Sequence, residues 1–546
     1  MQAVIASAPG KVLITGGYLI LEKPNAGIVL STTARFYTIV KPLRKEVEPG
    51  SWAWGWTDVK VISPQLSREV DYKMSMNHFT LQLISPRNSS NPFVEQAIQY
   101  AIAAAKMSFS EKDKNDAFDR LLLQGIHITI LGSNDFYSFR NQIEALGLPL
   151  LPETLSTIPP FSPLTLNTGS SNGTNSGDNC KPEVAKTGLG SSAAMTVSVV
   201  AAILHYLKAI SLPILDSNLS EDNANNSGLD LVHAIAQSAH CMAQGKIGSG
   251  FDVSAAVYGS QRYIRFSPTI LSSAQVVSPF SKQLLDIVNN IINQNWDHEK
   301  TLFSLPPLMT LLLGEPGSEG SSTPSMVGAV KKWQNFDSCG STEIYKSLAE
   351  ANLMLEIQFK ALSMFAREHW EIYKYVILNC SGHKSGKWRG LVVDQLQESI
   401  VKTLIGAREA FLQIRSHMQK MGMAACVPIE PESQTQILNS TMNLEGVLLA
   451  GVPGAGGYDA IFAITLGESD KTVSKTWSSA GILPLLVSED PRGVSLESND
   501  PQVHQFQCLE MILRSGEGIH ALRLRFGSDA CYIASFSTTS CESKNR

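Results

Sequence analysis

One short segment constrains the fold most strongly: KTGLGSSAAMT, residues 186–196, which leads straight into a long apolar run. Glycine adopts backbone conformations closed to other residues, so Gly188 and Gly190 allow a sharp turn just before a helix. The unpaired N–H groups at a helix N-terminus, together with the helix dipole, favour an anion at that end. The residues alone leave two interpretations: Ser191 or Ser192 caps a buried helix, or the loop holds a phosphate.

Familiar nucleotide-binding motifs do not fit this segment. A P-loop has its Lys and Ser or Thr after the glycines, whereas Lys186 and Thr187 precede them here. The dinucleotide fingerprint G-x-G-x-x-G is matched neither at 188–193 nor at 454–459, and no G-x-S-x-G elbow occurs at these loops. The segment is therefore a candidate phosphate loop of another family.

The pattern of the remaining chain predicts an α+β protein in two lobes joined near residues 268–280. Ser/Asn/Gly-rich stretches at 159–182 and 216–228 are too poor in apolar residues to fold alone. Strands are predicted in the first forty residues, at 126–132 and in AAVYGSQRYIRF at 255–266, and helices at 94–107, 191–208, 229–245, 343–366 and 391–420. From 446, a strand and a glycine loop are predicted to lead into a helix or a further strand.

Bulk properties exclude several classes of protein. A chain of 546 residues is too long for one ordinary core. Its 44 Lys and Arg against 49 Asp and Glu argue against a nucleic-acid partner or a polybasic membrane surface. The apolar run that follows residue 192 is too short to span a bilayer, and the N-terminus lacks a secretory pattern, so an intracellular protein is predicted. The eight cysteines form no CxxC pair, so neither a zinc site nor a disulfide framework is indicated.

Two further glycine-rich segments lie before and after the central one in the sequence. APGKVLITGGY begins at residue 8 and GVPGAGGYDA covers 451–460. Read in order, these three segments resemble the three motifs of the GHMP kinases, a family of small-molecule kinases. Residues 239–266 and 320–333 are most similar to the eukaryotic, plant-like branch that phosphorylates 5-phosphomevalonate. The resemblance runs from residue 3 to beyond 460.

The resemblance implies a fold and a reaction. The fold would be the two-lobe GHMP kinase fold, with a ribosomal-protein-S5-like N-terminal lobe at 1–270 and a ferredoxin-like C-terminal lobe at 271–546. ATP and Mg²⁺ would be used to convert 5-phosphomevalonate to 5-diphosphomevalonate in isoprenoid biosynthesis, by a monomer or homodimer in the cytoplasm. The peroxisome is the alternative compartment, although the C-terminal ESKNR is not an S-K-L signal.

The central loop would then bind the triphosphate of ATP, with the Ser192 hydroxyl reaching Mg²⁺. The resemblance assigns nucleotide binding to Lys186, Thr187, Gly188, Leu189, Gly190, Ser191, Ser192, Ala193, Ala194, Met195 and Thr196.

Two residues outside that loop would carry the chemistry. Lys11 occupies the lysine position of the first motif, where a cation can stabilise charge on the transferring phosphoryl group. The alternative is a surface lysine at the start of a strand. Asp252 matches the family's active-site aspartate and would also contact Mg²⁺, whereas an isolated Asp is otherwise a helix cap or a solvated acid. The mevalonate kinase branch has a metal-binding glutamate before that aspartate, but AQSAHCMAQGK at 236–246 contains no carboxylate.

Candidates for the acceptor site are less specific. Lys246 is predicted to bind the substrate phosphate, because a compact cation suits that group, while His240 is equally a phosphate ligand or a core histidine. Tyr18 is predicted to line the acceptor pocket or to start a strand. Ser321 and Ser322 are predicted to approach the acceptor phosphate or to lie in an ordinary loop. Two rival functions remain: a sibling such as mevalonate kinase, disfavoured by the missing glutamate, and a non-catalytic ligand sensor, disfavoured by the presence of Lys11, Ser192 and Asp252.

Overall fold

The computed structural model describes residues 3–44, 55–84, 90–109, 112–164, 185–214, 223–272, 283–317 and 323–503. The described strands are β1 Val4–Leu13, β2 Ala26–Pro42, β3 Trp56–Ser63, β4 Arg68–Ser75, β5 Leu81–Leu83, β6 Ile126–Gly132, β7 Gln261–Ile264, β8 Glu299–Leu302, β9 Met309–Glu315, β10 Val447–Gly451, β11 Ile461–Leu466, β12 Leu483–Pro484 and β13 Ser495–Leu496. The described α-helices are α1 Pro92–Met107, α2 Lys112–Leu123, α3 Arg140–Ala145, α4 Pro152–Ser156, α5 Ser191–Tyr206, α6 Asn223–Gln244, α7 Phe251–Tyr258, α9 Leu284–Ile292, α10 Thr323–Phe336, α11 Ser338–Glu368, α12 Trp370–Ser381, α13 Gln395–Ala425, α14 Glu432–Met442 and α15 Asp470–Ser479.

A large sheet organises the first part of the chain. Its strand order is β13-β1-β2-β6-β3-β4-β5, and β7 pairs with both β2 and β8. All pairs are antiparallel except β3 with β6. The register of β1 on β2 shifts between Pro9 and Lys11, and such a bulge commonly re-aims a side chain.

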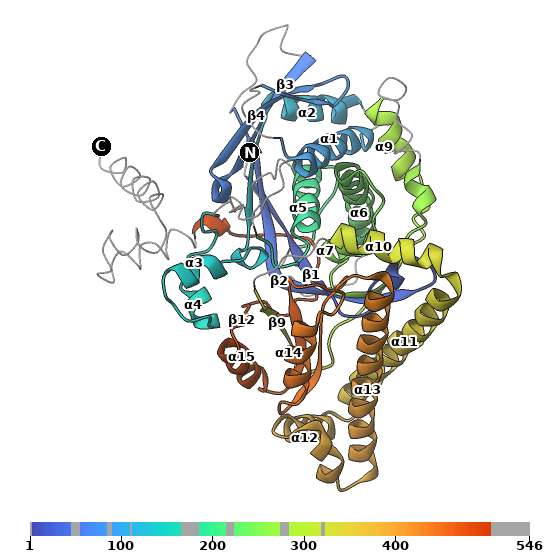
Figure 1. The fold of residues 1–546 in the computed structure, drawn as a ribbon. Helices are drawn as coiled ribbons and strands as arrows, with labels where there is room; N and C mark the ends of the chain where they lie inside the picture. The colour runs from blue at the N-terminus through green and yellow to red at the C-terminus, as the bar shows by residue number, and fades with distance from the viewer. Residues whose placement is uncertain are drawn as a thin grey trace, which may run out of the picture.

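Helix α5 forms the centre of the hydrophobic core. It is buried on nearly all sides, which matches its continuous Val, Ala, Ile and Leu sequence. One side packs on β1 and β2, and the other packs on α1 and α6 (Figure 1). Because α5 is enclosed in this way, the position of its N-terminus relative to the sheet is fixed.

A second, four-stranded sheet has the order β10-β11-β9-β12 and is antiparallel throughout. The long helices α11 and α13 pack along each other beside it (Figure 1). The predicted lobe boundary at residue 270 does not coincide with the division between the two sheets. Strands β8 and β13 come after this boundary but join the first sheet. That boundary stays a prediction.

Most predicted elements are present, with two corrections. The predicted helix at 229–245 begins earlier, at Asn223, within a polar stretch that was expected to be irregular. Residues 255–258 belong to α7 and not to a strand, and the small side chains of Ala255, Ala256 and Val257 are buried where this helix packs on β1. The passage that follows the third glycine segment, predicted as a helix or a strand, is a strand, β11. Most of the 159–182 stretch lies outside the described residues.

Within the described part of the chain, none of the helices combines the length and the apolar character that crossing a membrane requires.

Candidate active site

The N-terminus of α5 opens at the central glycine loop. Gly190 precedes the helix in the left-handed conformation, with φ of 77°, and no side chain caps the first turn. The Gly190 carbonyl accepts hydrogen bonds from the N–H groups of Ala193 and Ala194, at 3.1 and 3.2 Å. The N–H groups that precede them are therefore free of capping side chains, which is the arrangement expected of an anion site. Ser191 and Ser192 begin the helix but do not cap it.

Lys11 is held against this loop by two hydrogen bonds. Its backbone N–H donates to Leu189 at 2.9 Å, and its ammonium donates to the carbonyl of Gly188 at 3.0 Å. The ammonium also lies 5.4 Å from the centre of the Phe251 ring. Burial lowers the pKa of Lys11, and the charge of Asp252 partly offsets this effect. Lys11 is thus a half-buried cation between two glycine loops, not a solvated surface lysine.

Asp252 lies in the first turn of α7, which also begins at a left-handed glycine without a side-chain cap. Gly250 has φ of 82°, and an added Cβ there would lie 2.7 Å from Phe266. The Asp252 carboxylate accepts a hydrogen bond from the N–H of Val253 at 3.0 Å. Since its charge acts on both Lys11 and His240, Asp252 belongs to the same electrostatic cluster as these residues.

His240 of α6 connects this cluster to α5. Its Nε2 lies 3.1 Å from the Ser192 hydroxyl oxygen and 3.5 Å from Nε2 of Gln244. Burial lowers the pKa of the imidazole, Asp252 raises it and Lys246 lowers it further. The structure thus gives His240 a third role that the sequence did not indicate, namely direct contact with Ser192.

The loop between α6 and α7 is held by a buried arginine. Arg265, just after β7, donates to the carbonyls of Ile247 and Gly248, at 3.2 and 2.7 Å. Lys246 precedes these carbonyls, and its side chain is exposed beside the cluster. Neither Arg265 nor Phe251 carries a sequence signal that separates it from ordinary strand and helix residues.

The third glycine segment docks onto the first. The N–H of Gly454 donates to Leu13 at 3.1 Å, and the hydroxyl of Tyr18 donates to Ala455 at 2.9 Å. Tyr18 is buried and precedes a short 3₁₀ helix, so it does not start a strand. The N–H of Gly457 in turn donates to Ile429 at 2.8 Å.

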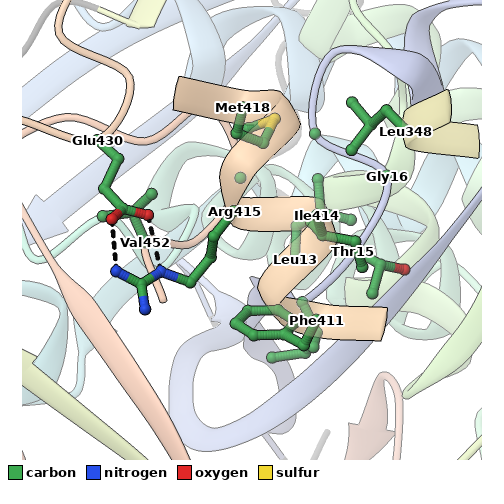
Figure 2. A pocket seen from close by; sticks show the side chains of 13 residues that line it. Leu13, Thr15, Gly16, Leu348, Phe411, Ile414, Arg415, Met418, Glu430 and Val452 are labelled. Atoms are coloured by element: carbon green, nitrogen blue, oxygen red, sulfur yellow. Dashed lines mark hydrogen bonds and ion pairs between the residues drawn. The ribbon is translucent and has the colours of Figure 1, made fainter. Parts of the chain in front are cut away.

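A small pocket lies where the first segment meets α13 (Figure 2). Residues 13–17 and Gly454 form part of its wall, and Phe411, Ile414 and Met418 of α13 form another part. Arg415 and Glu430 also line it and make a buried ion pair of 2.6 Å, drawn as dashed lines in Figure 2. The pocket therefore marks the junction between the first sheet and the helices of the second part of the chain.

The other predicted nucleotide-binding residues differ in their placement. Thr187 is buried, and its N–H donates to Phe136 at 3.2 Å, while Lys186 is exposed beside Tyr137. Ala193, Ala194 and Thr196 face the core, and Met195 is half-buried. Their assignment to ATP stays a prediction, as do the roles of Ser321 and Ser322, which lie outside the described residues.

Comparison with known proteins agrees with this geometry. Residues 181–260, which contain the central loop, His240 and Asp252, match the model of the GHMP kinases N terminal domain. The fold resembles that of a Lin0012 protein from Listeria innocua, with a TM-score of 0.58 and 16% identity over 91% of this chain and 100% of the other. It also resembles Streptococcus pneumoniae phosphomevalonate kinase in complex with phosphomevalonate and AMPPNP, with a TM-score of 0.50 and 16% identity over 90% and 100% of the chains. Fold and site together define a GHMP-type kinase.

Sequence relatives narrow the class. The chain is 61% identical to a protein named peroxisomal phosphomevalonate kinase in Arabidopsis thaliana, over 92% of this chain and 97% of the relative. It is 32% identical to phosphomevalonate kinase of Aspergillus fumigatus, over 87% and 90% of the two chains. The chain belongs to the phosphomevalonate kinase family.

Proposed function

We propose that this chain transfers the γ-phosphoryl group of ATP to the phosphate of 5-phosphomevalonate, giving 5-diphosphomevalonate and ADP in the mevalonate route to isoprenoids. One observation supports this reaction more than any other: the ammonium of Lys11 lies 3.0 Å from Gly188 of the central loop and within the electrostatic influence of Asp252. A fixed cation beside a helix N-terminus suits phosphoryl transfer, which depends mainly on positioning and charge stabilisation.

The acceptor needs no strong base. A phosphate monoester has its second pKa near ~6 and is already largely ionised at neutral pH. Asp252 therefore orients Lys11 or the substrates and does not remove a proton. Lys11 stabilises the charge that develops on the transferring group.

The residues present fit a magnesium ion that arrives with the nucleotide. Ser192 and Asp252 offer hard oxygen ligands, and Mg²⁺ commonly keeps phosphate oxygens and waters for its remaining positions. Among the residues that the structure describes, no group of three or more His, Cys, Asp and Glu could hold a metal by itself. In shared coordination by protein and ATP, the ion would neutralise phosphate charge.

The acceptor phosphate is assigned to Lys246, with Tyr18 and the serines at 321 and 322 as further candidates. Lys246 is exposed and lies close enough to the cluster for its charge to act on His240. Tyr18 would act through the third glycine segment, which its hydroxyl contacts.

Acceptor preference tests the proposal directly. The full chain is given ATP and Mg²⁺ with either 5-phosphomevalonate or mevalonate, and ADP release is followed together with the phosphorus NMR spectrum of the product. We expect turnover with 5-phosphomevalonate and the paired resonances of a diphosphate ester. A preference for mevalonate would contradict the proposal, as would nucleotide binding without turnover on either acceptor, which would indicate a ligand sensor.

The assembly and compartment complete the proposal. A monomer or homodimer is expected, and light scattering after size-exclusion chromatography measures which of them forms. The cytoplasm is the predicted compartment, with the peroxisome as the alternative that the name of the Arabidopsis relative suggests. Fluorescent fusions at either end of the chain distinguish the two.

A further inference from the structure

His240 combines two properties that a core histidine does not need. Its side chain is almost fully buried, at 2% exposure, yet its Nε2 is directed at the Ser192 hydroxyl at the N-terminus of α5. The ring is packed at 5.2 Å from the centre of Phe93, which comes from α1. The imidazole is thus fixed by three helices that converge on the central loop.

The Ser192 hydroxyl requires a hydrogen-bond partner to hold it in one orientation. A serine side chain has three staggered rotamers, and an isolated hydroxyl at a helix start can populate more than one of them. Ser192 is half-buried and is the residue predicted to present its oxygen to the nucleotide's phosphates and cation. A hydrogen bond of 3.1 Å to a rigid ring selects one rotamer and one direction for the oxygen lone pairs.

We propose that His240 is a positioning residue for phosphoryl transfer, which holds the Ser192 hydroxyl in the orientation that binds the donor phosphates and their cation. The proposal rests on the proposed function, because it concerns the same nucleotide site. His240 acts through Ser192 and does not contact the acceptor. Gln244, one turn further along α6, adds a second contact to the same ring nitrogen at 3.5 Å.

A second buried histidine on α6, His233, provides a matched control. His233 lies two turns before His240 and is equally buried, at 1% exposure. It packs on Tyr258, Trp296 and His298, with ring centres 5.5, 5.1 and 4.3 Å away. Replacing His233 therefore removes a buried imidazole from α6 without touching Ser192.

The experiment is a double-mutant cycle between His240 and Ser192 in the full chain. The variants are His240→Leu, Ser192→Ala and the double variant, with His233→Leu as control and His240→Gln as the conservative replacement. Leu fills a similar volume but cannot bond the hydroxyl, whereas Gln can place an amide near the position of Nε2. Activity with 5-phosphomevalonate and the calorimetric affinity for a non-hydrolysable ATP analogue with Mg²⁺ are both measured, together with the melting temperature.

We expect His240→Leu to reduce kcat and nucleotide affinity by about 10- to 100-fold, the range typical of residues that orient a ligand. The double variant should fall no further than Ser192→Ala, because both changes remove the same interaction. His240→Gln should recover part of the loss, and His233→Leu should leave activity and affinity unchanged.

Three results would overturn the proposal: wild-type kinetics in His240→Leu, losses that multiply in the double variant, or an equal loss in His233→Leu. If His240→Leu does not fold, His240→Asn, whose side chain is too short to reach Ser192, takes its place in the cycle. Failure of the proposed function is distinguishable, because the wild-type chain would then be inactive on 5-phosphomevalonate while the nucleotide-affinity cycle could still be measured.

Discussion

The hydroxyl of Tyr18 donates a hydrogen bond of 2.9 Å to the carbonyl of Ala455, across 437 residues of sequence. This bond ties the loop that follows Lys11 to the third glycine segment. Because Gly454 also bonds Leu13, the first and third segments form one connected surface beside the central loop. The three segments are therefore a single structural unit assembled from distant parts of the chain.

Removing that bond should weaken the unit without destroying the fold. Tyr18→Phe leaves the Ala455 carbonyl without its partner, which costs about 1–3 kcal/mol when the group is buried. We expect a lower melting temperature and a several-fold higher KM for 5-phosphomevalonate. Tyr375→Phe on α12, where the side chain is 53% exposed, is the control and should match the wild type in both measurements. Equal behaviour of the two variants would contradict the role of Tyr18.

The two charged residues Lys11 and Asp252 are expected to dominate catalysis. Lys11→Met and Asp252→Ala should each give a folded protein with kcat reduced by at least about 10²–10³-fold, the loss seen when a group that stabilises transition-state charge is removed. Lys41→Met is the matched control, because Lys41 is exposed at the far end of β2. Steady-state ADP release and circular dichroism measure activity and folding. Retained turnover in either site variant would remove that residue from the mechanism.

Alanine substitutions at Gly188 and Gly190 distinguish the effect of backbone strain from the effect of contact with Lys11. An added Cβ at Gly190 would lie 2.9 Å from Cε of Lys11, whereas an added Cβ at Gly188 would have no atom within 4 Å. The φ values of Gly190 and Gly188 are nearly equal, at 77° and 78°. Both Ala variants carry a left-handed strain of about 1–2 kcal/mol. Only Gly190→Ala displaces Lys11, so its kcat should fall by about 100-fold, as a small misplacement of a reacting group can cause. Similar kcat values for the two variants would show that strain, not contact, sets the effect.

Activity should decline at a lower alkaline pH than the pKa of an unperturbed lysine would give. Burial lowers the pKa of Lys11 below 10.5, and Asp252 raises it only in part. As pH rises through this lowered pKa, the ammonium loses the charge that stabilises the transferring group, so kcat/KM falls. Asp252→Asn removes the opposing effect and should move what remains of the profile to lower pH. The pH dependence of kcat/KM checks both expectations, and in Lys11→Arg the decline should disappear.

The half-buried carboxylate of Glu489 should make the free energy of unfolding depend on pH near neutrality. Burial raises the pKa of Glu489 from 4.5 to about 7, although its oxygens accept the N–H of Leu305 at 3.2 Å. Between those two pH values the folded state binds more protons than the unfolded state, so the free energy of unfolding falls as pH rises. Glu489→Gln should flatten this dependence between pH 5 and about 7 in thermal melts. The control Glu468→Gln, at an exposed residue, should retain the wild-type slope.

The structure brings the three main predicted site residues to neighbouring glycine turns, and their roles stay predictions. Lys11, Ser192 and Asp252 could be proposed because each lies in a glycine-rich segment that resembles a motif of the GHMP kinases. The start of α6 at Asn223 was missed because polar residues there suggested a loop, while the helix is stabilised by its packing further along. The contact of His240 with Ser192 could not be predicted, because it depends on how α6 packs against α5. Arg265 was missed for a similar reason, since its carbonyl partners belong to a different loop.

The pairing of β13 with β1 has a consequence for biosynthesis. Ser7 pairs with Ser495, and Arg35 of β2 donates to the carbonyl of Gly493, so the strand that carries Lys11 is flanked by a segment from a distant part of the chain. During translation, β1 is made long before β13, so its edge at Ala6 and Ser7 stays unpaired until residues 493–496 leave the ribosome. Such an edge is a template for pairing with other chains. Pairing along this edge of the strand that carries Lys11 therefore waits for the synthesis of β13, and a product truncated before β13 would keep the edge exposed.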